Sequence, residues 1–90
     1  MALFRANTET EFNKVVSNLK KLGYVWATDF PVHEPTFKEC KAFYHGNSKL
    51  LIHTFFNDIT RKNEMSAATL SVLKTYPQYK GINLRKEIRS

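Results

Sequence analysis

The feature that most constrains this chain is an amphipathic stretch between Thr8 and Gly23. Large apolar side chains recur in it at intervals of three and four residues, which is the spacing of one face of an α-helix. Thr8 and Glu11 have the spacing of a capping box, in which each side chain bonds the other residue's backbone N–H. Gly23 suits the left-handed position after a last turn, with Tyr24 folding back onto the helix. The sequence therefore predicts an amphipathic helix over residues 8–22.

Short apolar segments lie on either side of this helix. Ala2–Ala6 and Tyr24–Phe30 are rich in apolar and aromatic side chains and predict two strands. Pro31–Glu39 follows and predicts an irregular loop, because proline lacks the N–H that a central strand needs. A strand, a helix and a strand with short junctions predict a helix that packs across a sheet.

A two-residue turn signal at Gly46-Asn47 predicts a β-hairpin. Its strands are expected at Cys40–His45 and Ser48–Phe56, both of which carry large apolar residues. If the loop consists of those two residues alone, the register sets Cys40 opposite His53. Because both faces of this hairpin carry apolar groups, we expect one face to meet the helices and the other to stay partly exposed.

The last third of the chain predicts a second helix. Asn57–Glu64 is a polar connector, Ser66 is a suitable N-cap, and Pro77 limits the helix at its other end. Ile82–Arg85 then alternates apolar and polar residues in the manner of a short edge strand. The tail Lys86–Ser90 is charged, and we expect it to be frayed.

These elements predict the α+β class in a single domain spanning residues 1–90. Their order is β-α-β-β-β-α with a candidate last edge strand, which fits a small antiparallel sheet with two helices packed on one face. The chain is 42% hydrophobic, which suffices for one small core, and its single cysteine excludes an internal disulfide framework. It has neither an apolar run of about 18 residues nor a signal-peptide core, so we expect a cytoplasmic protein without a membrane partner.

Positive charge is concentrated in the last third. The formal net charge is +6, and residues 61–90 hold seven Lys and Arg against two acidic residues. A basic surface favours polyanions because binding releases their counterions, and exposed aromatic rings can stack on bases. We therefore expect this region to contact nucleic acid or a nucleic-acid-handling complex. The candidate binding residues are Lys74, Tyr76, Tyr79, Lys80, Arg85, Lys86 and Arg89, and all of them from Tyr79 onward are expected to be exposed.

A second set of residues could carry chemistry. Histidine titrates near neutral pH, and His33 or His53 could act as the base of a metal-independent ribonuclease. Cys40 opposite His53 would pair a nucleophile with a base. The histidines and the cysteine follow no zinc spacing, and the glycines form no nucleotide-binding loop. We therefore expect no metal and no cofactor, and the sequence favours a binding protein over an enzyme.

The stretch Phe12–Trp26 is an amphipathic helix that ends in Leu22-Gly23-Tyr24-Val25-Trp26, and it resembles small accessory proteins of bacteriophages and other mobile elements. Such proteins often combine a short strand, a helix, a strand with the pattern GYxW and a hairpin. The resemblance covers about half of the chain. It implies a protein that binds a host component, for example an inhibitor of a defence nuclease such as an anti-CRISPR protein.

A second resemblance is to HicA-like toxins, which have a double-stranded-RNA-binding fold and cut messenger RNA. Leu19–Trp26, Phe43–Phe55 and Glu64–Lys74 follow that family's order of helix, three strands and helix. His33 lies roughly where the family's active-site histidine is expected, but the glycine of that motif is missing. The resemblance implies an RNA-cleaving toxin in which His33 or His53 is the base.

The sequence thus favours a small basic protein that binds nucleic acid or a nucleoprotein complex. One alternative is an mRNA-cleaving toxin of the HicA type. The other is a protein-directed inhibitor that docks on a host protein through an exposed sheet face. The oligomeric state is left open by the sequence.

Overall fold

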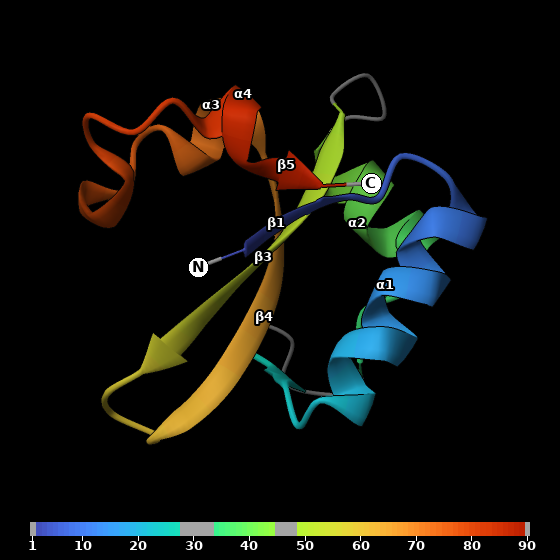
Figure 1. The fold of residues 1–90 in the computed structure, drawn as a ribbon. Coiled ribbons are helices and arrows are strands. Elements are labelled where there is room, and N and C mark those ends of the chain that lie inside the picture. Colours follow the sequence, from blue (N-terminus) through green and yellow to red (C-terminus); the bar gives the residue numbers. More distant parts are fainter. Residues whose placement is uncertain (1, 28–33, 45–48, 90) are drawn as a thin grey trace.

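The computed structural model describes residues 2–27, 34–44 and 49–89 (Figure 1). Within these residues five strands form one mixed sheet, and the predicted α+β class is confirmed. The strands are β1 (Ala2–Arg5), β2 (Val25–Trp26), β3 (Leu50–Asn57), β4 (Lys62–Thr69) and β5 (Ile88–Arg89). The helical segments are α1 (Glu9–Lys21), α2 (Phe37–Phe43), α3 (Leu70–Leu73), the 3-10 turn η1 (Pro77–Tyr79) and α4 (Leu84–Glu87).

The sheet is built around β3, and its strand order is β2-β4-β3-β1-β5. β4 is antiparallel to β3 from Leu50 opposite Thr69 to Asn57 opposite Lys62. β1 is antiparallel to β3 on the other side, while β2 and β5 join β4 and β1 as short parallel strands. The expectation of a wholly antiparallel sheet is therefore wrong, because each parallel pair is joined by a long crossover rather than a tight turn.

Both faces of the sheet are covered, so the fold has three layers (Figure 1). α1 and α2 lie on one face, where the core includes Phe12 and Ile52. Residues 70–88 lie on the other face, where the core includes Leu51 and Leu84. The expectation of helices on one face only is wrong. The reason is that β3 carries large apolar side chains on both of its faces, and each face must be removed from water.

The start of α1 confirms the predicted N-cap. The Glu11 backbone N–H donates a hydrogen bond to Thr8 Oγ1, with 3.1 Å between the nitrogen and the oxygen. The Glu11 carboxylate accepts a hydrogen bond from the Asn7 backbone N–H at 3.1 Å, one residue earlier than a capping box requires. The helix start is therefore capped, but the reciprocal half of the predicted box is shifted.

The end of α1 follows the predicted glycine ending. Gly23 has a φ of +93°, in the left-handed region that favours glycine. The Tyr24 N–H donates to the carbonyl oxygen of Leu19 at 3.0 Å, and the Gly23 N–H donates to that of Lys20 at 3.0 Å. These two bonds define a Schellman motif, and they turn the chain from α1 into β2.

The segment after β2 differs from the prediction, since residues 37–43 form α2 instead of loop and strand. Thr36 and Glu39 make a full capping box: each side chain accepts a hydrogen bond from the other residue's backbone N–H, at 3.2 and 3.0 Å. Phe43 therefore lies on a helix and is 69% exposed, whereas the sequence predicts it in the hairpin strand Cys40–His45. The predicted turn at Gly46-Asn47 lies outside the described residues.

The hairpin of this fold joins β3 to β4, where a polar connector and a helix were predicted. Ser66, the expected helix N-cap, lies in β4 opposite His53. Met65 and Ala67 are buried on one face of β4 and Ala68 on the other. A strand buried on both faces has no apolar alternation, so its pattern does not separate it from a buried helix.

The turn of this hairpin is held by a buried carboxylate. Glu64 is 2% exposed and accepts hydrogen bonds from Asn57 Nδ2 at 2.9 Å and Thr60 Oγ1 at 3.0 Å. The Asn57 side-chain oxygen in turn accepts the Ile59 backbone N–H at 2.9 Å, and Arg61 adopts a left-handed φ of +58°. The polar character of this connector therefore reflects a tight turn rather than a loop between a strand and a helix.

The C-terminal segment also differs from the prediction. Ile82–Arg85 is not an edge strand; α4 begins at Leu84, whose side chain is buried between the helix and the sheet. The tail is not frayed at Ile88 and Arg89, which form β5 alongside Leu3 and Phe4 of β1. A tail that pairs with the sheet cannot be removed without cost to the fold.

We expect Leu84→Ala to lower the free energy of unfolding by about 2–5 kcal/mol, because it opens a cavity beneath α4. Arg85→Gln, at the exposed neighbouring position, should change it by less than about 0.5 kcal/mol. Urea unfolding followed by circular dichroism measures both values. Equal effects of the two substitutions would contradict the packing of this segment on the sheet.

Candidate functional site

The predicted binding residues all lie in the C-terminal layer or in β5, but they do not form one site. Lys74, Lys80, Lys86 and Arg89 are exposed, as a role in binding requires. Arg85 is exposed on α4 and lines a hollow described below. The two tyrosines of the set take part in a buried aromatic cluster instead.

That cluster surrounds His53 on the C-terminal face of the sheet. Tyr79 is 3% exposed, and its hydroxyl shares a hydrogen bond of 3.0 Å with His53 Nδ1. Burial, followed by the charge of Tyr76, raises the pKa of Tyr79 above its ordinary value of 10.0. Tyr76 is half-buried, with its ring centre 5.7 Å from that of His53 and 6.1 Å from that of Tyr79. The expectation of an exposed Tyr79 is therefore wrong, because this ring is core.

The predicted pair of Cys40 and His53 is not formed. Cys40 lies in α2 and belongs to the core on the α1 face, whereas His53 faces Leu3 and Ser66 across its neighbouring strands. His53 is 2% exposed, so no substrate reaches it as a base. His33, the other catalytic candidate, lies outside the described residues. The geometry therefore offers no nucleophile and base pair from Cys40 and His53.

The Cys40 thiol is held in its neutral form. Burial, with a smaller contribution from the Glu39 charge, raises the pKa of this thiol from 9.0 to about 11. A reactive cysteine has a lowered pKa and an exposed sulfur, and Cys40 has neither. Its role is that of a small core side chain.

This raised pKa predicts a loss of stability in alkali. The neutral thiol stabilises the fold fully below pH 9, and this contribution is lost as the pH rises to about 11, because the unfolded chain ionises first. The stability difference between the wild type and Cys40→Ala should shrink by on the order of 1–3 kcal/mol between about pH 8 and about pH 11. Urea unfolding of both proteins measures it; other groups cancel in the difference. A difference that does not change with pH would contradict a buried neutral thiol.

The strongest candidate site is a hollow of about 490 Å³ beside β1 and α4. It is lined by three cationic side chains from separate parts of the chain: Arg5 at the end of β1, Lys49 before β3 and Arg85 in α4. We call this site the basic hollow. Its remaining lining residues are Asn7, Leu51, Leu70 and Ile88.

The electrostatics of the basic hollow favour an anion. None of its described lining residues is acidic, and within the described part of the chain none of the three cations forms an ion pair. Like charges held around one hollow repel each other, and a bound anion relieves this repulsion. Arg5 and Arg85 can each present two parallel N–H groups to a phosphate, while Lys49 adds a point charge.

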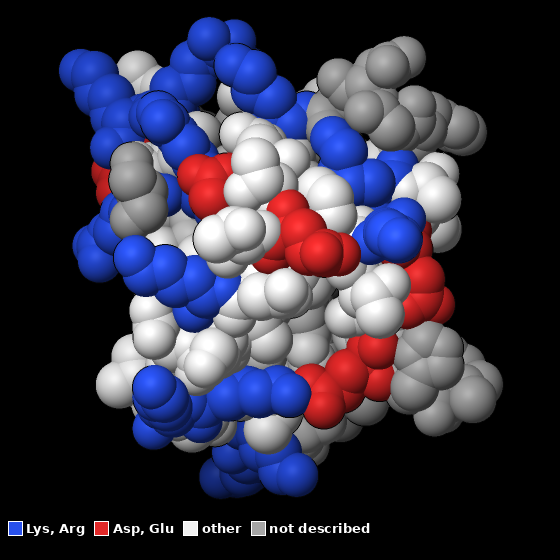
Figure 2. Space-filling view, turned by 90° about the vertical axis from the view of Figure 1, so that its right-hand side faces the viewer, with Lys and Arg blue, Asp and Glu red and all other residues white. Residues whose placement is uncertain are grey.

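Charge is also unevenly placed on the side of α1. Figure 2 shows Lys and Arg side chains along the upper and lower margins of this side, with acidic side chains between them. Within the described residues, Glu34 forms an ion pair with Lys20 of α1. The middle of the α1 side is therefore less suited to a polyanion than the basic hollow.

Arg5 and Lys49 are not among the binding residues predicted from the sequence. That prediction follows the positive charge of the last third of the chain, and these two residues lie in the first two thirds, which carry little net charge. The alternation of side chains along β1 indicates the position of Arg5. Because Phe4 faces the α1 layer, Arg5 extends from the opposite face of the strand. That it meets Arg85 there depends on the parallel pairing of β1 with β5, which the sequence did not predict.

Comparison with known proteins finds no match: no family model, no curated protein and no solved structure matches the chain. In the residues that the structure describes, no three His, Cys, Asp or Glu side chains lie together as metal ligands would. Among those same residues, no helix has the length and apolar character to cross a membrane. The basic hollow therefore has to be interpreted from its own chemistry.

Proposed function

We propose that this protein binds nucleic acid, and that the basic hollow holds its phosphate backbone. The observation that carries this proposal is the convergence of Arg5, Lys49 and Arg85, none of which has an ionic partner in the described part of the chain. Three cations around one hollow match closely spaced anionic groups, and the phosphates of a nucleic acid provide them.

A further cation can extend this contact. Arg89 lies in β5 and Lys86 in α4, the two elements that border the basic hollow through Ile88 and Arg85. Lys86 is exposed and follows Arg85 in α4, so a nucleic acid held in the hollow can extend toward it, whereas Arg89 is in register with Phe4 and faces the α1 side of the sheet. Long, exposed cations supply affinity and association rate more than specificity.

The lining of the hollow indicates binding without strong sequence preference. Its apolar members, Leu51, Leu70 and Ile88, offer no hydrogen bonds to base edges, and its described lining holds no aromatic ring for stacking. Phosphate contacts position a protein on nucleic acid without carrying sequence information. Tyr79 cannot stack on a base because it is buried.

We expect the affinity for duplex DNA to fall as the salt concentration rises, because each phosphate contact releases counterions. Each cation of the hollow should contribute about one phosphate contact to the slope of log affinity against log salt concentration. The triple variant Arg5→Gln, Lys49→Gln, Arg85→Gln should reduce that slope by about three and weaken binding at least tenfold at about 50 mM salt. Fluorescence anisotropy with labelled duplex DNA, single-stranded DNA and RNA at about 50 and 200 mM salt measures both effects.

A matched control separates the site from overall charge. Lys38→Gln, Lys62→Gln, Lys80→Gln removes the same three charges from exposed positions that line neither the hollow nor the groove described below. The proposal requires this control to retain most of the affinity. Equal losses in the two triple variants would overturn the assignment of the hollow. Absence of binding at low salt would overturn the function and leave a protein partner as the alternative, and RNA cut during the titration would point to the toxin alternative.

A further inference from the structure

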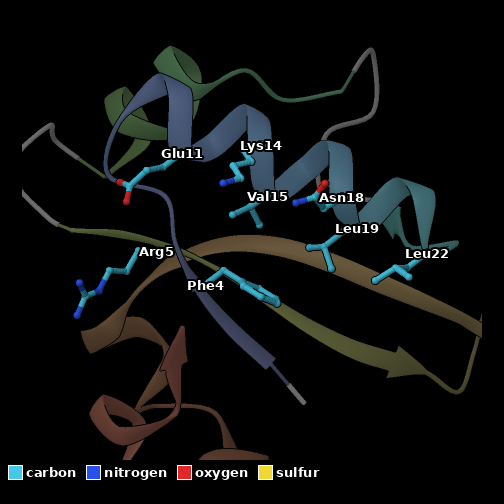
Figure 3. A pocket seen from close by; sticks show the side chains of 8 residues that line it. All are labelled: Phe4, Arg5, Glu11, Lys14, Val15, Asn18, Leu19 and Leu22. Atoms are coloured by element: carbon cyan, nitrogen blue, oxygen red, sulfur yellow. The ribbon is translucent and has the colours of Figure 1, made fainter. Parts of the chain in front are cut away.

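An apolar groove of about 400 Å³ lies between α1 and β1, on the opposite side of the sheet from the C-terminal layer (Figure 3). Phe4 and Leu19 point into the space between the helix and the strand, and Arg5 also lines it, at the end of β1. Val15 and Leu22 complete the apolar lining. We call this site the α1 groove; Glu11, Lys14 and Asn18 lie at its polar rim.

The apolar stripe of α1 is buried over only part of its length. Phe12 and Leu19 are buried, and Val15 is half-buried, whereas Leu22 in the same stripe is 72% exposed. Leu22 therefore extends the apolar lining of the groove into solvent. An occupant that covers Leu22 would remove this apolar surface from water.

The charges of α1 indicate what that occupant is. The first turn of the helix carries Glu9 and Glu11, and the last turn carries Lys20 and Lys21. Lys20 pairs with Glu34 in its own chain, which leaves Lys21 at the end of the helix opposite Glu11. A helix with acid at one end and base at the other is complementary to an antiparallel copy of itself, and the helix dipoles are then also opposed.

We propose that the α1 groove binds α1 of a second copy of this chain in an antiparallel, two-fold symmetric dimer. One strip of the helix surface runs along the groove, with side chains at intervals of four, three and four residues: Glu11, Val15, Asn18 and Leu22. A two-fold axis through the middle of this strip, between Val15 and Asn18, covers Leu22 of both copies. It also sets Glu11 of each copy beside Lys21 of the other.

The α1 groove and the basic hollow share one lining residue, Arg5. The other residues that line the groove differ from those that line the hollow. Association of two copies is measured in the absence of nucleic acid, so its outcome does not depend on whether the hollow binds phosphate.

The first test is sedimentation equilibrium of the full chain in the absence of nucleic acid. We expect a reversible dimer in the wild type and a dissociation constant raised at least tenfold in Leu22→Glu. The matched control is Ile59→Glu, since Ile59 is 94% exposed at the β3–β4 turn and the same charge is introduced there. A monomeric wild type, or a dimer that tolerates Leu22→Glu, would overturn the proposal.

A charge exchange tests the antiparallel arrangement. Glu11→Lys and Lys21→Glu should each weaken self-association, because each homodimer then has two like-charged pairs. In an equimolar mixture, the two substituted side chains would meet as an opposite-charge pair at one end of the interface. The unchanged Glu11 of one variant would meet the unchanged Lys21 of the other variant at the opposite end. The mixture should therefore associate more tightly than either variant alone, and a mixture that stays as weak as the separate variants would overturn the two-fold pairing of α1.

Discussion

Burial of β3 on both faces is the constraint on which the rest of this structure depends. Leu50 and Ile52 point to the α1 layer and Leu51 to the C-terminal layer, and all three are almost fully buried. A strand of this kind needs neighbours at both edges and cover on both faces. It receives β4 and β1 as neighbours, with α1 and α2 on one face and residues 70–88 on the other. The short α3, α4 and η1 are held by this packing rather than by their own length.

The same constraint places the two candidate sites along one strand. β1 lies next to β3, and its alternating side chains reach both outer layers. Phe4 lines the α1 groove, and Arg5 lines both this groove and the basic hollow. The two sites therefore meet at Arg5. They differ in the rest of their lining, which includes Leu19 and Leu22 in the groove and Lys49 and Arg85 in the hollow.

Prediction from the sequence succeeded where the signal is local. Thr8 and Gly23 mark the ends of α1 through bonds made within a few residues, and the structure contains those bonds. It was wrong in two places, for different reasons. Cys40 is predicted in a strand from a turn signal, although a local signal, the capping box of Thr36 and Glu39, starts a helix there. Ser66 was assigned to a helix because a strand buried on both faces has no period of its own.

The sequence by itself determined the α+β class, the position of α1 and the excess of positive charge, because these follow from residue spacing and composition. Only the tertiary structure decided which cations act together. Arg5, Lys49 and Arg85 are far apart along the chain and meet through the pairing of β1 with β3 and β5. It also decided that Tyr79 is core and Leu22 is surface. The physical reason is that the burial of a side chain and the distance between two charges depend on which strands pair. Strand pairing is set by the packing of the whole core rather than by any one segment.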